Sequence, residues 1–312
     1  MLRKLLDDFT KHFIYTLFII AVASFVTYFL IGSKLDQTVN RIAEQISNQP
    51  ISSVMLPHPE NTLYVERGSP YDHRTIDGAT ESANVIFHGP RGKKKIALTF
   101  DAEMTDGMKA ALVSGKTKSS YDKKIIDILN QTQTKATLFL TGLWIELYPD
   151  ITKELSKNPI FELGSHSYTD SSFYGFCYGL KQIDKTLKIE DIGATEKLLR
   201  EKAGVDNKLF RFPGGCYTPA DVKLVNDVGD TVVHWDISGS DGFNTNTQQI
   251  IHNVTDNAQN GSIIILHLNG PPNVPKTAEA LPLIIDALKK KGFEFVKVSE
   301  LLGLPPENRI SN

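Results

Sequence analysis

The sequence predicts an α/β protein, a distorted (β/α)7-type barrel preceded by an N-terminal transmembrane helix. Three observations predict the barrel. From residue 93 onward, short apolar, β-branched runs alternate with segments of helical period, which is typical of a parallel sheet with helical crossovers. The short runs are continuously apolar, as strands covered on both faces should be. Polar residues gather directly after these runs, at the edge where β/α barrels build their sites.

The N-terminal segment predicts the transmembrane helix. Residues 13–32 form an uncharged apolar run, and about 20 such residues span the hydrocarbon core of a bilayer. Arg3, Lys4 and Lys11 precede the run, so the positive-inside rule places the N-terminus in the cytoplasm. A cleaved signal peptide and a buried core helix are the alternatives. We expect a single-pass protein of the cell membrane whose main domain is extracytoplasmic.

Composition divides the chain into four parts. Residues 1–34 are a cytoplasmic stub and anchor, and residues 35–92 are a linker or irregular stalk, because several prolines stand there among Ser, Asn, Asp and Gly. Residues 93–304 are the barrel domain, and residues 305–312 are a C-terminal tail. The net charge is −2 with no long basic run, which indicates that nucleic acid is not a partner.

The barrel domain divides into expected strands and helices by hydrophobic period. The expected strands are residues 96–100, 136–140, 161–165, 209–213, 231–237, 262–268 and 293–298. The expected helices are residues 121–131, 144–157, 189–204, 247–259 and 280–292. Residues 104–120 form an insert that we expect to be a loop, either a mobile substrate loop or an ordinary solvated one.

The first expected strand ends in a pair of acids. Residues two apart in a strand point to the same face, so Asp101 and Glu103 can face one site. An ordinary solvated strand end would look the same. After the third expected strand, His166 and Asp170 are four residues apart and can converge on one metal ion if the segment turns helical. A structural histidine is the alternative.

Three further strand ends carry polar groups. Arg211 ends the fourth strand and can hold a carboxylate by two parallel hydrogen bonds. The Pro-Gly-Gly turn that follows exposes N–H groups suited to an oxyanion hole. Asp236 lies at the end of the fifth strand, and Asp241 follows it. His267, after an all-apolar strand, is a candidate general acid.

Together, these motifs resemble the polysaccharide deacetylase family, the metal-dependent de-N-acetylases of chitin, peptidoglycan and related glycans. The resemblance covers about residues 93–304. It rests on five motifs that come in family order, namely TFDAEMT (99–105), GSHSYTD (164–170), RFPGG (211–215), WDISGSD (235–241) and ILHLNGPP (265–272). It implies a metal-dependent hydrolase that removes N-acetyl groups from a cell-envelope or extracellular polysaccharide.

The resemblance also implies a role for each matched residue. Asp101 matches the catalytic base that activates water, and Arg211 matches the residue that orients this base. The backbone N–H of Tyr217 lies near the position that stabilises the tetrahedral oxyanion. His267 matches the acid that protonates the leaving amine, with Asp236 or Asp241 orienting it.

Two positions depart from the family pattern. The second aspartate of the usual metal site is Ala102 here, and the second histidine is Asp170. The implied ligand set is therefore Glu103, His166 and Asp170, for a divalent ion. Zinc is the first choice, but this harder, more anionic set also suits manganese, cobalt or iron. A carbohydrate-binding pseudoenzyme that has lost the metal is the competing hypothesis, and a hydrolase of another acyl or amide bond is a third.

The two cysteines, Cys177 and Cys216, both follow strand ends on the proposed site face. Disulfides persist outside the cytoplasm. A bridge between them would tie the loop after the third strand to the turn after the fourth, beside Tyr217. Two buried thiols that never meet are the alternative.

Overall fold

The computed structural model describes residues 85–175, 177–206, 208–242, 244–270, 272–305 and 308–309. Within these ranges no helix has the length and apolar character needed to cross a bilayer. The predicted anchor at residues 13–32 lies outside the described residues, so it stays a prediction.

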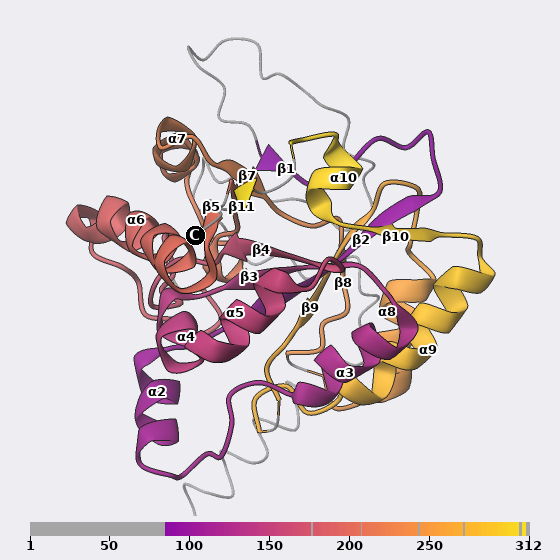
Figure 1. Ribbon diagram of the computed structural model, residues 1–312, viewed down its shortest axis with the longest axis horizontal. Helices are drawn as coiled ribbons and strands as arrows, with labels where there is room; N and C mark the ends of the chain where they lie inside the picture. Colours follow the sequence, from indigo (N-terminus) through magenta and orange to yellow (C-terminus); the bar gives the residue numbers. More distant parts are fainter. Residues whose placement is uncertain are drawn as a thin grey trace, which may run out of the picture. The chain divides into compact units, whose positions relative to one another are not determined.

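The described chain alternates strands and helices (Figure 1). The strands are β1 (Val85–Ile86), β2 (Lys95–Ala102), β3 (Ala136–Leu140), β4 (Phe161–Ser165), β5 (Val205–Asp206), β6 (Leu209–Phe210), β7 (Thr231–Val233), β8 (Ile237–Ser238), β9 (Ile263–His267), β10 (Glu294–Val296) and β11 (Asn308–Arg309). The α-helices are α2 (Asp106–Val113), α3 (Lys123–Thr132), α4 (Gly142–Leu147), α5 (Pro149–Lys157), α6 (Lys188–Leu198), α7 (Pro219–Asp227), α8 (Thr247–Thr255), α9 (Thr277–Lys290) and α10 (Val298–Leu302). A π-helical turn, Leu199–Ala203, continues α6, and short 3₁₀ turns span Lys185–Leu187 and Pro213–Gly215.

One parallel sheet organises the domain. Its strand order is β1-β7-β6-β4-β3-β2-β9-β8, and β10 pairs with the start of β2. All of these pairings are parallel. In the part of the chain that the structure describes, the outer strands β1 and β8 are not paired with each other. The predicted parallel α/β sheet is confirmed, as a curled half-barrel rather than a barrel closed by hydrogen bonds.

The alternation of side chains along β2 separates the two faces of the sheet. Ile96, Leu98 and Phe100 pack in the large core beneath the helices. Ala97 packs instead with residues such as Phe139 in a second core. Thr99 and Asp101 share the face of Ala97, so β2 carries polar side chains on its inner face toward its carboxyl end.

Helices cover the outer face of the sheet in two groups. Helix α9 contacts both α3 and α8 on one side, and α4 contacts both α5 and α6 on the other (Figure 1). Polar N-caps start several of them, including Asp122 before α3 and Asn246 before α8. The single helix expected over residues 144–157 is divided into α4 and α5, because Pro149 cannot continue the preceding turn.

Four further elements of the structure were not expected from the sequence. The insert 104–120 contains helix α2, whose N-cap is Thr105. Helix α7 was not expected, although Thr218 and Asp221 form a capping box at its start. Strand β1 lies within the predicted stalk yet pairs with β7. Strand β11 lies within the predicted tail yet pairs with β5.

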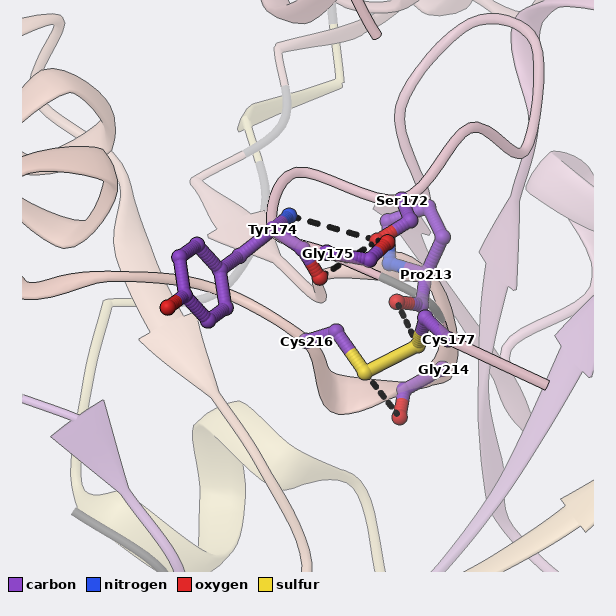
Figure 2. The surroundings of a disulfide bond; sticks show 7 residues. All are labelled: Ser172, Tyr174, Gly175, Cys177, Pro213, Gly214 and Cys216. Carbon is purple, nitrogen blue, oxygen red and sulfur yellow. Dashed lines mark hydrogen bonds between the residues drawn. A yellow bond between two sulfur atoms is a disulfide. The ribbon is translucent and has the colours of Figure 1, made fainter. Parts of the chain in front are cut away.

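The predicted disulfide is present. Cys177 and Cys216 are bonded, with their Cα atoms 6.1 Å apart (Figure 2). Gly214 is required beside the bridge, because a Cβ atom there would lie 2.4 Å from the Cys177 Sγ atom. The loop that carries Cys177 is also held internally, since the Ser172 hydroxyl accepts from the Tyr174 amide and donates to its carbonyl. The bridge thus ties the segment after β4 to the turn after β6.

We expect the double variant Cys177→Ser/Cys216→Ser to be less stable than the wild type by roughly 3–4 kcal/mol, because the bridge closes a loop with a sequence separation of 39 residues. Urea unfolding of both proteins, with and without reductant, measures this difference. Reductant should destabilise the wild type and leave the double variant unchanged. Two free thiols in wild-type protein unfolded without reductant would contradict the bridge.

Candidate active site

His166 lies directly after β4 and is completely buried. Its backbone N–H donates to the Leu140 carbonyl, and its Nδ1 atom lies 2.9 Å from the Arg211 carbonyl oxygen. A carbonyl can only accept, so Nδ1 carries the proton and the lone pair is on Nε2. Burial, the largest influence, lowers the pKa of His166 and favours the neutral ring. This is the arrangement of a metal-binding histidine held by a neighbouring carbonyl.

Asp170 approaches His166 without a helix. Its Oδ1 atom is 3.8 Å from His166 Nε2, but residues 166–170 are irregular rather than helical as the spacing predicted. Ser167 and Asp170 instead adopt left-handed backbone conformations, with φ of 63° and 56°. Such conformations are uncommon for residues with a Cβ atom and cluster at functional sites. The approach of Asp170 to His166 was predicted correctly. The helical turn that was expected to bring them together is not present between residues 166 and 170.

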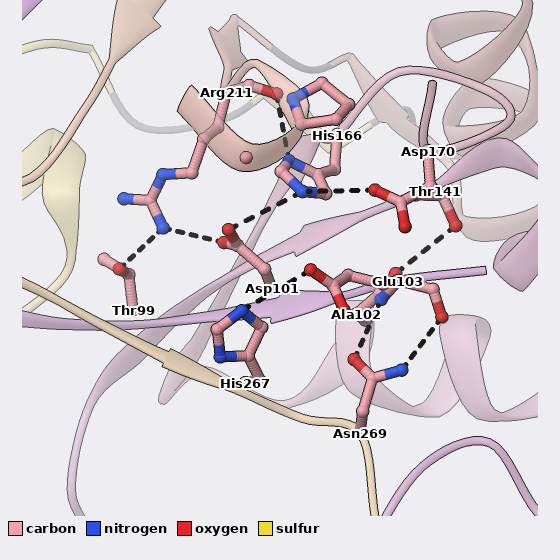
Figure 3. A network of polar contacts seen from close by, with 12 residues as sticks. Thr99, Asp101, Ala102, Glu103, Thr141, His166, Asp170, Arg211, His267 and Asn269 are labelled. Atoms are coloured by element: carbon pink, nitrogen blue, oxygen red, sulfur yellow. Dashed lines mark hydrogen bonds and ion pairs between the residues drawn. The ribbon is translucent and has the colours of Figure 1, made fainter. Parts of the chain in front are cut away.

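Glu103 completes the predicted ligand set (Figure 3). It follows the last residue of β2, on the same face as Asp101. One ligand atom from each of Glu103, His166 and Asp170 can be chosen so that all three lie within 4.8 Å of one another. Among the described residues, this is the one group of three or more such side chains that meets this limit.

The three side chains fit a divalent cation. His166 Nε2 and Asp170 Oδ1 are buried without a hydrogen-bond partner, which normally carries a substantial cost in free energy. Burial, followed by the nearby charges of Glu103 and Asp101, raises the pKa of Asp170 well above its ordinary value. Positive charge placed between these groups would satisfy the orphan atoms and offset the repulsion among the carboxylates.

Arg211 holds Asp101 in the interior of the sheet. The guanidinium donates from Nη1 to Asp101 Oδ1 at 2.7 Å and to the Thr99 hydroxyl at 2.8 Å. Its Nε and Nη2 atoms donate to the carbonyls of Val233 and His234. The expected pair of parallel hydrogen bonds to the carboxylate is therefore absent, because Asp101 Oδ2 faces His166 Nε2 instead, at 3.6 Å.

The surrounding cations control the charge of Asp101. Burial, the largest influence, would raise the pKa of this carboxyl group. The charge of Arg211 is the largest opposing influence, ahead of the interactions with His166 and His267, and together they lower the pKa below its ordinary value. Asp101 is therefore ionised at neutral pH and can accept a proton.

His267 ends β9 directly opposite Asp101 in the β2–β9 pairing. Asp241 accepts from its Nδ1 atom and from its backbone N–H, both at 2.8 Å. Its Nε2 atom lies 3.4 Å from Glu103 Oε1. Burial would lower the pKa of His267, but Asp241 and then Glu103 raise it well above the ordinary value.

The structure distinguishes the two acids proposed to orient His267. Asp236 is not beside His267. Its carboxylate accepts from the backbone N–H of Ile263, at the other end of β9, and forms an ion pair with Arg91 at 2.8 Å. Asp241 therefore takes the orienting position, and Asp236 holds the amino end of the strand, remote from the site.

The Pro-Gly-Gly turn is only partly open to a ligand. The N–H groups of Gly215 and Cys216 donate to the carbonyls of Phe212 and Pro213 within the turn. Two of the amides suggested for an oxyanion hole are thus engaged. Tyr217 follows, with its ring stacked on Phe212. The role of its N–H group stays a prediction.

Three supporting residues were not recognised in the sequence. Thr99 shares a guanidinium nitrogen with Asp101, and Thr277 donates its hydroxyl to Asp241. Asn269 binds the backbone of Glu103. Strand alternation was an available signal for two of them, because Thr99 is two residues from Asp101 and Asn269 is two residues from His267.

Known proteins resemble this chain in sequence. The polysaccharide deacetylase family model matches residues 88–233. A peptidoglycan-N-acetylglucosamine deacetylase of Bacillus cereus is 31% identical over 220 residues, which is 70% of this chain and 92% of that protein. The peptidoglycan-N-acetylmuramic acid deacetylase PdaA of Bacillus subtilis is 24% identical over 264 residues, 83% of this chain and 89% of that protein.

Solved structures share the fold. A peptidoglycan N-acetylglucosamine deacetylase superposes with a TM-score of 0.62 at 27% identity, covering 73% of this chain and 96% of that one. An acetyl xylan esterase from Clostridium thermocellum, solved with a cobalt ion, gives 0.53 at 27% identity, covering 67% and 92%. A pseudoenzyme of the CE4 family from Bacillus anthracis gives 0.57 at 22% identity over 71% and 69%, which bears on the fold alone.

We expect His166→Ala to weaken binding of zinc, manganese and cobalt by more than the 10- to 100-fold that loss of an outer-shell partner costs. The affinity of each metal-free protein is measured by competition with a chromogenic chelator. His252→Ala is the matched control, because His252 lies on the exposed surface of α8, beside Asp256. Equal affinity in His166→Ala and the wild type would show that the ligand set is wrong.

Proposed function

The chain belongs to the polysaccharide deacetylase family and is a deacetylase hydrolase, and from this premise we propose that it removes N-acetyl groups from a cell-envelope glycan with a bound divalent metal. Peptidoglycan is the first substrate to test, because relatives from two Bacillus species are named as peptidoglycan deacetylases.

The position of Asp101 and His267 carries this proposal. They face each other across the β2–β9 pairing, and both contact the candidate metal ligands, Asp101 through His166 and His267 through Glu103. The pKa of the carboxyl group is lowered and that of the imidazole is raised. At neutral pH the site therefore holds an ionised base and a protonated acid side by side, which hydrolysis of an amide requires.

A divalent ion held by Glu103, His166 and Asp170 would act as a Lewis acid, lowering the pKa of the attacking water and polarising the amide carbonyl. Asp101 accepts a proton from that water as its oxygen bonds to the carbonyl carbon. Arg211 keeps Asp101 in place and ionised. The backbone N–H of Tyr217 is proposed to stabilise the negative charge that develops on the carbonyl oxygen.

His267 completes the reaction from the other side. With Nδ1 held by Asp241, its Nε2 proton is directed toward the site and passes to the amide nitrogen as the carbon–nitrogen bond breaks. The products are acetate and a free amine on the sugar. Asp241 acts by holding the ring in this orientation and by stabilising its positive charge.

The competing pseudoenzyme hypothesis depends on the two substituted ligand positions. Ala102 offers no ligand atom, but Glu103 and Asp170 both reach His166. The residues proposed as base and acid are in place, together with Arg211 and Asp241 that hold them. These observations support an active enzyme over a protein that only binds carbohydrate.

We also propose that the protein is anchored in the cell membrane by residues 13–32, with its hydrolase domain outside the cytoplasm. The disulfide between Cys177 and Cys216 supports this placement, since such bonds persist mainly in oxidising compartments. A cell-envelope substrate is consistent with the same location.

We expect Asp101→Asn to lower turnover by about 10²–10⁴-fold, because the variant lacks the general base. Acetate release from peptidoglycan and from chitin oligosaccharides measures this loss. The substitution also leaves the buried Arg211 charge uncompensated, so we expect a stability loss of about 3–5 kcal/mol, to be measured by urea unfolding. Near-normal turnover in folded Asp101→Asn would refute the assigned role.

Substitution of Asp241 and of Asp236 tests two different roles, the orientation of His267 and the support of the amino end of β9. We expect Asp241→Asn to approach the 10²–10⁴-fold loss of turnover that a general acid contributes. Asp236→Asn should lower stability, since it breaks the ion pair with Arg91, yet leave turnover within about twofold of the wild type, because no contact joins it to His267. Steady-state kinetics and urea unfolding of both variants provide the comparison, and equal kinetic losses would contradict this division.

A further inference from the structure

The predicted metal ligand Glu103 stands just beyond the end of the regular sheet. The β2–β9 pairing ends where Asp101 faces His267, and one more backbone bond follows, from the Leu268 N–H to the Asp101 carbonyl at 2.8 Å. β2 itself ends at Ala102. The backbone of Glu103 therefore needs another partner if its carboxylate is to keep a defined position.

The side chain of Asn269 supplies that partner (Figure 3). Its Oδ1 atom accepts from the Glu103 N–H at 3.1 Å, and its Nδ2 atom donates to the Glu103 carbonyl at 3.0 Å. One amide side chain thus binds both polar groups of one peptide residue, as a neighbouring strand would. Asn269 has 0% exposure, so no water competes for these bonds.

The same amide also holds the far end of the insert 104–120. Nδ2 of Asn269 donates to the Ser120 carbonyl at 3.3 Å. The residue that precedes the insert, Glu103, and its last residue, Ser120, are therefore joined through one side chain. We call this place, where the two ends of the insert 104–120 come together, the neck of the insert. A second bond at the neck runs from the Asp122 N–H to the Leu268 carbonyl at 2.9 Å.

The chemistry of these bonds requires an amide. Asn269 accepts one hydrogen bond and donates two, so each of its polar atoms has a partner. An aspartate at this position would lose both donors and face two carbonyl oxygens. A leucine of similar size would leave the Glu103 N–H and two carbonyls unsatisfied.

Glu103 needs this restraint more than the other two ligands do. His166 and Asp170 are buried, whereas the Glu103 side chain is 24% exposed. Its Oε1 atom also lies 3.4 Å from Nε2 of His267, which could draw the carboxylate away from the ion. We propose that Asn269 is a positioning residue for the metal centre, which directs the Glu103 carboxylate toward the ion and links its position to the neck of the 104–120 insert. This inference rests on the metal centre of the proposed function.

The test compares metal affinity in Asn269→Ala, Asn269→Ser and Asn158→Ala, using zinc and manganese with a competing chelator. Asn158 is the matched control, because it also holds a backbone N–H, that of Ile160, and a side chain, that of Asn130, at the opposite edge of the sheet. We expect both Asn269 variants to bind metal 10- to 100-fold more weakly, the cost of losing an outer-shell partner. Asn158→Ala should bind as the wild type does.

Acetate release at increasing metal concentration provides the second measurement. Turnover of the Asn269 variants should recover at saturating metal, whereas a general loss of structure would not be rescued. Wild-type affinity in either Asn269 variant would overturn the proposal, as would failure of both variants to fold in excess metal. A wild type that binds metal but releases no acetate from any glycan would refute the proposed function and leave the role of Asn269 supported by its affinities.

Discussion

The rest of the site depends on the buried ion pair between Arg211 and Asp101. Removing two charges from water is costly, and the cost is recovered only if the remaining donors and acceptors are satisfied. Arg211 also donates to the Thr99 hydroxyl and to the carbonyls of Val233 and His234, and its guanidinium carbon lies 4.0 Å from the centre of the Phe139 ring. Strands β2 and β3 and the ends of β6 and β7 are thereby joined around the carboxylate of Asp101.

The ion pair also explains the states of the neighbouring groups. Arg211 keeps Asp101 ionised, and its own carbonyl fixes the tautomer of His166. One residue thus holds the proposed base, Asp101, through its side chain and the proposed metal ligand, His166, through its backbone carbonyl. Three carboxylates, those of Asp101, Glu103 and Asp170, gather around His166, and burial, followed by the charges of Glu103 and Asp101, raises the pKa of Asp170.

Strand β9 illustrates how the same residue type takes different roles at the two ends of one strand. Asp236 binds the first residue of the strand and is paired with Arg91, so it secures the sheet. Asp241 binds the last residue, His267, and is held by Thr277. Because the proposed site lies at the carboxyl edge of the sheet, the length of β9 separates the structural carboxylate of Asp236 from the carboxylate of Asp241, which contacts the proposed acid.

The sequence by itself determined the parallel sheet, its principal strands and the residues that gather at its carboxyl edge. These follow from local properties, namely apolar runs, helical period and side-chain alternation. The sequence therefore predicts that Asp101, His166, Arg211 and His267 lie at strand ends on one edge of the sheet. The disulfide was also predictable, because strand order brings the segments of both cysteines to the same edge. The short strands β1 and β11 were missed, since each forms only by pairing with a distant strand, β7 and β5 respectively. Helix α2 was missed although a local signal, the N-cap Thr105, stands at its start.

Only the tertiary structure decided how the site is completed. Ser167 and Asp170 turn left-handed, which the spacing of the motif does not reveal. The choice of Asp241 over Asp236 depends on which end of β9 each acid reaches. The bonds from Asn269 to Glu103 join residues 166 positions apart. Strand alternation places Asn269 on the same face as His267, but the partner that it binds is selected by the packing of the whole sheet rather than by neighbouring residues in the chain.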